Sequence, residues 1–221
     1  MKNSLFLALL CIAIIPAKAQ KIIEKHIAFS PKNFVSMNFQ ISDSIHIITW
    51  KKDEVYIRSS IDVNDNQDND DYKMVFDETG STINVSAKLE TENIRRSKRD
   101  SGNCCCCCNY RTKIYHEVYI PENADFSVET INGNIIINGN TAEIRAKSIS
   151  GYIDLAIAPA RKADVRMHTI TGTMYSNIDL PTNRHIKQVG GGSISAELNG
   201  GGGKAIDIET ISGNIYFRKE S

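Results

Sequence analysis

A ten-residue phrase occurs four times between Ala124 and Gly213, and it constrains the fold more than any other feature of this chain. Each copy alternates apolar and polar residues and ends in Thr or Ser, then Ile, a polar residue and Gly. The closing glycines are 18, 21 and 41 residues apart, so a degenerate copy is expected near Ile186, within the longest interval. A period of about 20 residues with two-residue alternation is too short for a helical hairpin repeat and is typical of one coil of a β-solenoid.

The apolar columns of the repeat predict which side chains the coils bury. Side chains alternate faces along a strand, so positions two residues apart share a face. The first two columns are Phe126, Ile144, Val165 and Ile206, then Val128, Ala146, Met167 and Ile208. A third apolar column, which we also expect to be buried, contains Ile131, Ile149, Ile170 and Ile211. One coil buries too few side chains to fold alone, so neighbouring coils, about 4.8 Å apart, would bury one another's columns.

The glycine that closes each copy marks an expected corner of the coil. These glycines are Gly133, Gly151, Gly172 and Gly213. Glycine suits a corner where φ must be positive or where another backbone passes close. The pattern therefore predicts an all-β chain built as a single-stranded β-helix or β-roll solenoid with about 20 residues per coil.

Three regions follow from the pattern along the chain. Residues 1–19 contain a basic start, a short apolar run and a small-residue cleavage site, which indicate a signal peptide and an exported chain. Residues 20–121 alternate strand patterns with turns, for example at 51–54 and 77–80, and predict antiparallel hairpins. We expect these strands to continue or cap the solenoid of residues 122–221 within one continuous domain, because its first coil would otherwise expose an open edge.

The charge balance and the hydropathy argue against two classes of partner. The chain has 26 Lys and Arg residues against 26 Asp and Glu residues, which gives no global field to attract nucleic acid or an anionic membrane. Beyond the predicted signal peptide, no segment approaches the ~20 apolar residues that a membrane span needs. The expected location is the periplasm or the cell surface, and a signal peptide does not distinguish them.

Two further segments, together with the repeat, resemble those of one particular protein family. One strand pattern ends in Trp50-Lys-Lys-Asp-Glu-Val55, and Val118-Tyr-Ile-Pro-Glu122 precedes the Thr-Ile-Asn-Gly and Thr-Ile-Ser-Gly repeats. Together they resemble the putative-adhesin family of bacterial exported β-strand-repeat proteins, over nearly all of the mature chain. The resemblance implies a right-handed β-helix or β-roll and a non-enzymatic role in the envelope of Gram-negative bacteria. It supplies no catalytic residues, and the cysteine-rich loop departs from the family pattern.

Five consecutive cysteines stand in a basic loop: Cys104, Cys105, Cys106, Cys107 and Cys108. Nearby Arg and Lys residues lower the pKa of a thiol and favour the thiolate, which is both a nucleophile and a metal ligand. Zinc sites, however, use cysteines spaced two to four residues apart, and a disulfide between neighbours is strained. We interpret the loop as an insertion with mixed disulfides. A redox role, a disulfide-linked dimer and a metal site are the alternatives.

An acidic loop offers hard oxygen ligands of the kind that calcium accepts. Its candidate ligands are Asp62, Asn64, Asn66 and Asp68. Gln67 stands where an EF-hand loop needs glycine, and Lys73 stands where the closing glutamate belongs. We interpret the segment as a solvated hairpin loop, and we expect neither a cofactor nor a resident metal.

The outward positions of the repeat do not gather the groups of an active site. Glu129, Lys147, His168 and Glu209 mix charges, and the sequence contains neither a Gly-x-Ser-x-Gly elbow nor a His-Glu-x-x-His pair. The sequence thus predicts a non-catalytic envelope protein that binds a protein or glycan ligand or serves as a scaffold. A periplasmic sensor with a redox-responsive cysteine loop and a polysaccharide-acting β-helix enzyme are the alternative functions.

Overall fold

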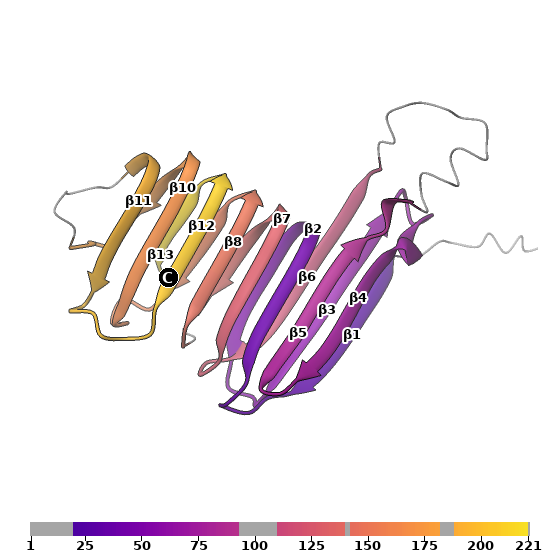
Figure 1. Ribbon diagram of the computed structural model, residues 1–221, viewed down its shortest axis with the longest axis horizontal. Coiled ribbons are helices and arrows are strands. Elements are labelled where there is room, and N and C mark those ends of the chain that lie inside the picture. Colours follow the sequence, from indigo (N-terminus) through magenta and orange to yellow (C-terminus); the bar gives the residue numbers. More distant parts are fainter. Residues whose placement is uncertain (1–19, 93–109, 140–141, 182–187, 221) are drawn as a thin grey trace, which may run out of the picture.

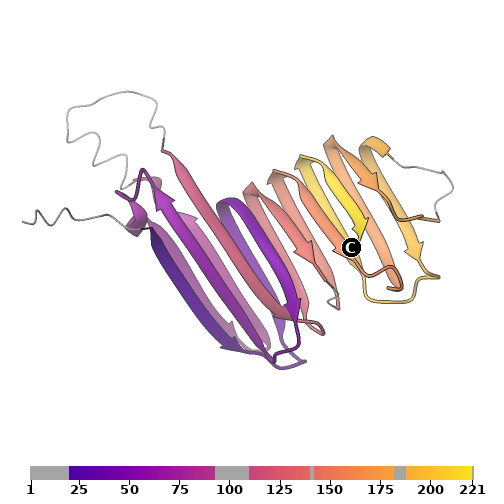
Figure 2. The same ribbon diagram turned by 180° about the vertical axis from the view of Figure 1, so that it is seen from behind.

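The structure is a computed structural model that describes residues 20–92, 110–139, 142–181 and 188–220, and it is an elongated body of strands (Figures 1 and 2). The N-terminal half contains β1 (Lys21–Ala28), β2 (Phe34–Trp50), β3 (Glu54–Val63), the short 3-10 helix η1 (Asn69–Asp71), β4 (Tyr72–Thr79), β5 (Thr82–Leu89) and β6 (Thr112–Pro121). The C-terminal half contains β7 (Asp125–Asn138), β8 (Ile144–Ser150), β9 (Ile153–Ile157), β10 (Ala163–Ser176), β11 (Gln188–Leu198), β12 (Ile206–Ser212) and β13 (Ile215–Lys219). Within the described ranges, no helix has the length and hydropathy needed to cross a membrane.

Six strands of the repeat region pair into a closed parallel ring. β7, β8, β12, β10, β13 and β9 are neighbours in that order, and β9 pairs back with β7. β7 and β10, each 14 residues long, close the ring because each is long enough to pair with two of its strands in succession. Their first halves pair with β8 and β12, and their second halves pair with β9 and β13. The result is a flattened six-stranded β-barrel with outer strands added to it.

This barrel overturns the predicted single-stranded β-helix solenoid. In a solenoid each copy of the repeat stacks on the copy before it in the chain. Here the last copy, in β12 and β13, lies between the second copy, in β8 and β9, and the third copy, in β10. The degenerate copy expected around Ile186 falls at the edge of the described residues. Ile186 itself lies outside the described residues, and β11 after it runs antiparallel to β10.

Two crossing loops explain how the last copy enters the middle of the barrel. The chain crosses over after β9 to reach β10, and it returns after β11 to reach β12. Asn199 ties the two loops together, since its Nδ2 donates to the carbonyl oxygens of Pro159 and Arg161 at 2.8 and 2.7 Å. A Cβ on Gly203 would overlap the carbonyl of Lys162, so the crossing point requires glycine.

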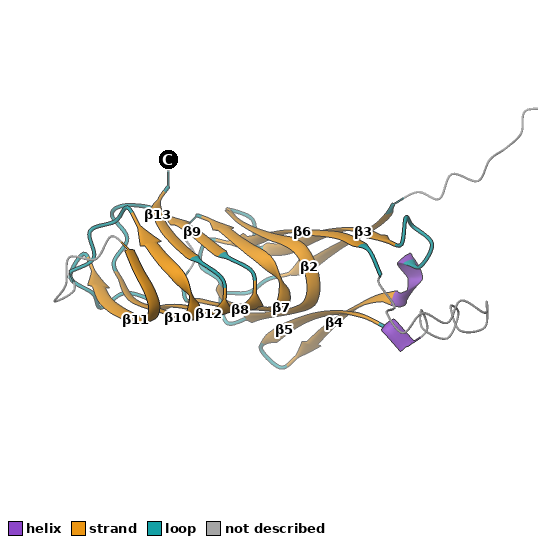
Figure 3. Cartoon of the chain, turned by 90° about the horizontal axis from the view of Figure 1, so that it is seen from above, coloured by secondary structure: helices purple, strands orange, loops and turns teal. Residues whose placement is uncertain are grey.

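The strands form two walls that face each other across the core, as Figure 3 shows edge-on. The first wall contains β4, β5, β8, β12 and most of β11 (residues 192–198) with the first halves of β2, β7 and β10. The second wall contains β1, β3, β6, β9 and β13 with the second halves of β2, β7 and β10. We call them the charged wall and the aromatic wall, after the side chains on their outer faces.

β2 joins the N-terminal strands to the barrel, because it pairs in parallel with β7 from Phe34 to Ile48. The predicted hairpin between β4 and β5 is confirmed. The hairpin expected around the turn at 51–54 is wrong: β2 pairs with β5, β6 and β7, whereas β3 pairs with β1 and β6. The N-terminal strands therefore extend both walls beyond the barrel, and β1 and β4 are their edges.

The first two apolar columns of the repeat are buried as predicted, but the third is not. The eight side chains of the first two columns are at most 3% exposed. Ile131, Ile149 and Ile170 are instead 50%, 39% and 57% exposed, and Ile211 is half-buried. Strict two-residue alternation explains the difference, because the inward face passes from the second column to the Thr or Ser that precedes each isoleucine.

Three of those inward side chains, Ser148, Thr169 and Thr210, hydrogen-bond to closing glycines. Thr210, for example, donates from Oγ1 to the carbonyl of Gly213 at 2.8 Å. The closing glycines stack so closely that a Cβ on Gly151 would overlap the carbonyl of Gly133, and Gly172 and Gly213 have similar overlaps. The corner prediction is therefore confirmed through close backbone approach, and Gly151 also has a positive φ of 146°.

Candidate functional site

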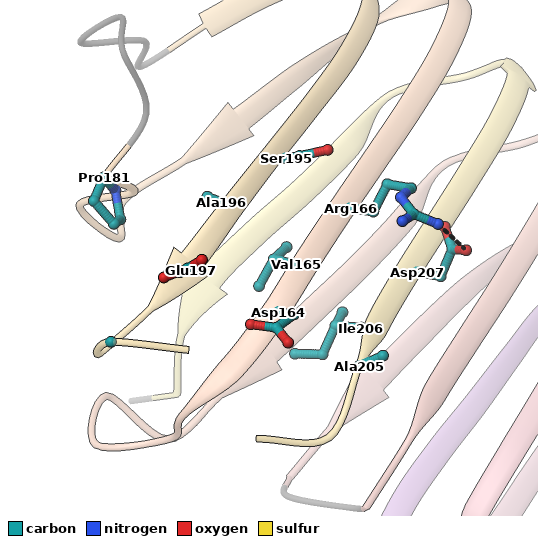
Figure 4. Close-up of a pocket in the computed structure, with 11 residues that line it drawn as sticks. Asp164, Val165, Arg166, Pro181, Ser195, Ala196, Glu197, Ala205, Ile206 and Asp207 are labelled. Carbon is teal, nitrogen blue, oxygen red and sulfur yellow. Dashed lines mark ion pairs between the residues drawn. The ribbon is translucent and has the colours of Figure 1, made fainter. Parts of the chain in front are cut away.

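An open groove of about 720 Å³ lies on the charged wall, over β10, β11 and β12 (Figure 4). Its charged and hydroxyl side chains are Asp164, Arg166, Ser195, Glu197 and Asp207. Outward positions of neighbouring strands supply them. Asp164 lies opposite Glu197 in the β10–β11 pair, and Arg166 lies beside Asp207 in the β10–β12 pair, with 3.7 Å between Nη1 and Oδ2.

The carboxylates of this groove are exposed, which suits binding better than acid–base catalysis. Asp164 accepts a hydrogen bond from the backbone N–H of Gly202 at 3.2 Å, and Asp207 is paired with Arg166. Catalysis by two carboxyl groups relies on different environments, one of which keeps its carboxyl protonated by burial. Asp164 and Glu197 are both exposed, so the groove offers them as acceptors for a polar ligand.

Beside the groove, a cross-strand row brings a histidine and a serine together. Glu209, His168 and Ser193 are neighbours on β12, β10 and β11, and His168 Nδ1 lies 2.7 Å from Ser193 Oγ. The repeat gives no signal for this proximity, because β11 lies outside the repeat register and pairs antiparallel. Lys147, rather than the imidazole, contacts the Glu209 carboxylate at 3.2 Å. The row therefore does not form an acid–base–nucleophile relay.

Outward-pointing aromatic side chains gather on the other wall. These are Trp50, Tyr56, Tyr115, Tyr119, Tyr152, Tyr175 and Tyr216. Three of them form what we call the Trp50 cluster: Trp50, Tyr56 and Tyr119, with ring centroids 5.2 to 6.2 Å apart. His26 stacks on Tyr56 at 4.4 Å, and Trp50 Nε1 donates to the carbonyl of Glu54 at 2.8 Å. The cluster is thus fixed in place on the outer face.

A second group, the Tyr216 cluster, contains Tyr152, Tyr175 and Tyr216. The rings of Tyr175 and Tyr216 are stacked, with centroids 5.2 Å apart and an interplanar angle of 8°, and Tyr152 meets Tyr216 edge-on at 5.9 Å. Next to this cluster, Arg218 donates from Nη2 to Asp154 Oδ2 at 2.8 Å, and a second bond joins its Nε to the same carboxylate. These bonds raise the pKa of Arg218 and hold its guanidinium against the Asp154 carboxylate.

A polar network lies buried between the walls in the N-terminal half. His116 is 1% exposed, with Nδ1 2.7 Å from Ser59 Oγ and Nε2 3.0 Å from the hydroxyl of Tyr72. Burial lowers the pKa of His116 to about 3 and raises the pKa of Tyr72. Both side chains are therefore neutral near pH 7. Because the network is closed to solvent, it stabilises the core rather than contacting a ligand.

The candidate calcium ligands of the acidic loop, which we interpret as a solvated hairpin loop, hydrogen-bond to the protein, mostly within the loop itself. Asp62 Oδ1 accepts from the backbone N–H of Asn66 at 2.8 Å, and Asp68 Oδ2 accepts from Asn64 Nδ2 at 2.5 Å. The described residues contain no group of three or more His, Cys, Asp or Glu side chains arranged to hold a metal ion. The cysteines at 104–108 and the predicted signal peptide lie outside the described residues.

No model of a known protein family matches the chain, and no curated protein matches it. Among solved structures, it is similar to a putative cell adhesion protein from Clostridium sporogenes, with a TM-score of 0.54 and 9% identity over 90% of this chain and 100% of that one. A putative adhesin from Parabacteroides merdae has a TM-score of 0.31 and 14% identity over 71% of this chain and 60% of its own. A putative adhesin from Bacteroides fragilis has a TM-score of 0.33 and 9% identity over 92% of this chain and 99% of its own. The resemblance inferred from the sequence is therefore supported at the level of fold by the Clostridium sporogenes protein.

Proposed function

We propose that this chain is a non-catalytic protein of the cell surface that binds a partner through the outer faces of its two walls. The observation that carries the proposal is that outward-facing polar and aromatic side chains form continuous rows across neighbouring strands. One such row on the charged wall runs from Glu129 through Lys147 and Glu209 to His168. Paired strands hold the side chains of a row at fixed positions, which suits recognition of a large partner.

The shared fold supports this proposal, because the Clostridium sporogenes protein is described as a putative cell adhesion protein. Fold alone does not determine function, so the surfaces carry the argument. The charged wall presents exposed carboxylates and ion pairs rather than a buried carboxyl group beside an oriented nucleophile. This chemistry favours binding over catalysis.

Two measurements test the proposed function, one on bacteria that export the chain and one with the purified chain. We expect added protease to cut the exported chain before the envelope is broken. We also expect beads coated with the purified chain to be retained on cell layers or extracellular matrix, compared with beads that carry the heat-unfolded chain. A chain that protease reaches only after lysis, together with no specific retention, would contradict surface binding and favour the periplasmic alternative.

A further inference from the structure

We propose that the aromatic wall binds an uncharged carbohydrate chain, with the Trp50 cluster and the Tyr216 cluster as its two stacking sites. This inference rests on the proposed binding function and gives the chemical class of the ligand. A sugar ring is amphipathic: its C–H groups pack on an aromatic face, and its hydroxyl groups hydrogen-bond to polar side chains nearby. Tyr and Trp offer large, rigid, amphipathic contact areas at a low cost in conformational entropy.

Ring faces remain available in the Trp50 cluster. The centroids of Trp50, Tyr56 and Tyr119 form a nearly equilateral triangle, with interplanar angles of 24°, 33° and 37°. In such a triangle no ring is sandwiched between the other two, although His26 covers one face of Tyr56. The ammonium group of Lys52 lies 4.5 Å from the centroid of the Trp50 ring, and the Lys52 side chain is 67% exposed. A ligand can therefore displace Lys52 from that face.

The charged side chains nearest the two clusters are paired with one another, which favours an uncharged ligand. Arg58 lies 3.3 Å from Glu24 and 3.6 Å from Glu117, and Arg218 contacts Asp154. An ionic ligand would have to break these pairs, whereas sugar hydroxyl groups can hydrogen-bond to them without separating the charges. Arginine–carboxylate pairs beside the aromatic rings thus supply the polar contacts that a neutral sugar needs.

The two clusters lie on one outer face, and the positions between them include the uncharged Ile48, Asn138 and Ile136 and the ion pair of Asp154 and Arg218. Tyr119 lies beside Ile48 of β2, which lies beside Asn138 of β7. Tyr216 lies beside Asp154 of β9, whose charge is paired with Arg218, and Asp154 lies beside Ile136 of β7. From β6 through β2, β7 and β9 to β13 there are four strand steps of about 4.8 Å, or roughly 19 Å. A linear oligosaccharide can therefore contact both clusters, whereas a single sugar contacts one.

A glycan array tests the ligand class with the mature chain, residues 20–221. We expect the chain to be retained on uncharged glycans and not on anionic ones. The uncharged glycan that binds most strongly is then titrated while the fluorescence of Trp50 is followed. Trp50 is the single tryptophan of the chain, so its emission reports directly on the Trp50 cluster. An array with no uncharged hit, or binding that leaves Trp50 emission unchanged, overturns the proposal.

Substitutions test whether the aromatic rings make the contact. Tyr119→Leu removes a ring but keeps apolar bulk, and Tyr119→Phe keeps the ring. We expect Tyr119→Leu and Tyr216→Leu each to weaken binding on the order of tenfold, and Tyr119→Phe to bind nearly as tightly as the wild type. Ile170→Ala, on the exposed face of the charged wall, is the matched control and should bind like the wild type. Circular dichroism establishes that each variant is folded. Wild-type affinity in both leucine variants overturns the proposal.

The failure of this inference differs measurably from the failure of the proposed function. In one outcome the chain binds no uncharged glycan, but coated beads are still retained on cells and protease treatment of those cells abolishes the retention. That result would keep the proposed binding function and identify the ligand as a protein instead of a carbohydrate. Beads that are not retained, together with an empty array, would remove both proposals.

Discussion

His116 is a residue whose surroundings differ greatly from those of a free side chain. Inside the protein it is neutral and hydrogen-bonded, with a pKa of about 3, whereas in an unfolded chain its pKa is about 6.5. Below pH 6.5 the unfolded state therefore binds a proton that the folded state does not. The contribution of His116 to stability is fully present above pH 6.5 and is lost as the pH falls from 6.5 towards 3.

Acidification should destabilise the wild-type chain more than a chain without this imidazole. Between pH 7 and pH 4.5, we expect His116→Gln to remove about 3 kcal/mol of the pH-dependent loss in unfolding free energy, since each pH unit below 6.5 corresponds to about 1.4 kcal/mol. Urea denaturation at the two pH values measures this difference, with His168→Gln, on the outer face, as the control. Equal losses in wild type and His116→Gln would show that His116 does not stay neutral in the folded state.

Gly151 is constrained by the backbone of the neighbouring strand β7 rather than by a side chain. We expect Gly151→Ala to lower the unfolding free energy by more than about 2 kcal/mol, because the added Cβ would overlap the carbonyl of Gly133 and φ is positive. Lys147→Ala, at an outward position of the same repeat, should cost less than about 1 kcal/mol, since it removes a surface ion pair. Denaturant titration of both variants compares them, and equal costs would refute the close approach at the corner.

At the scale of the strand, the repeat phrase describes a turn from one wall to the other. Its Thr or Ser points inward and, in the last three copies, hydrogen-bonds at a corner. Its Ile points to solvent, and its Gly lets neighbouring backbones approach. After the glycine the inward face resumes at Ile135, Ile153, Met174 and Ile215. The conserved appearance of the isoleucine within the repeat therefore does not reflect burial in the core.

Two substitutions on β8 separate the inward face from the outward one. Ile149→Asp should leave the chain folded, with a change in unfolding free energy of about 1 kcal/mol or less, because Ile149 is exposed. Ile144→Asp should unfold the barrel, because an unpaired charge at a fully buried position costs several kcal/mol. Thermal melting followed by circular dichroism distinguishes them. A cooperative transition at the wild-type temperature in Ile144→Asp, or an unfolded Ile149→Asp, would contradict the assignment of Ile144 to the inward face and Ile149 to the outward face.

At the scale of the whole molecule, the position of the last repeat copy makes the barrel depend on its C-terminal segment. β12 and β13 lie between the second copy and β10, so both neighbours lose a pairing partner if they are absent. In a solenoid stacked in chain order, removal of the last coil would shorten one end and leave the rest in place. The two architectures therefore differ in their response to truncation.

Removal of residues 204–221 should abolish cooperative unfolding of the repeat region, because it opens the barrel in its middle. Removal of residues 20–28, which form the edge strand β1, should cause a smaller loss, since β1 pairs with β3 alone. Hydrogen exchange of the two truncated chains measures which strands stay protected. Full protection of β7, β8 and β10 in the chain that ends at residue 203 would contradict the observed strand order.

The sequence alone determined the all-β class, the two inward columns and the glycine corners, because these depend on side-chain alternation and on steric space within a few residues. It also indicated the β4–β5 hairpin, whose turn is local. The exposed isoleucines were predictable from strict alternation, but their apolar character concealed the change of face at the preceding Thr or Ser.

The tertiary structure alone decided which strands are neighbours. The copies of the repeat present nearly the same inward columns, so any copy can pack against any other and the local sequence does not rank them. The crossing loops at Asn199 and Gly203 set the order instead, by placing the last copy in the middle of the barrel. The same pairing gathers Trp50, Tyr119 and Tyr216 on one wall, although they are far apart in the chain, because it is strand register that brings distant side chains onto a shared face.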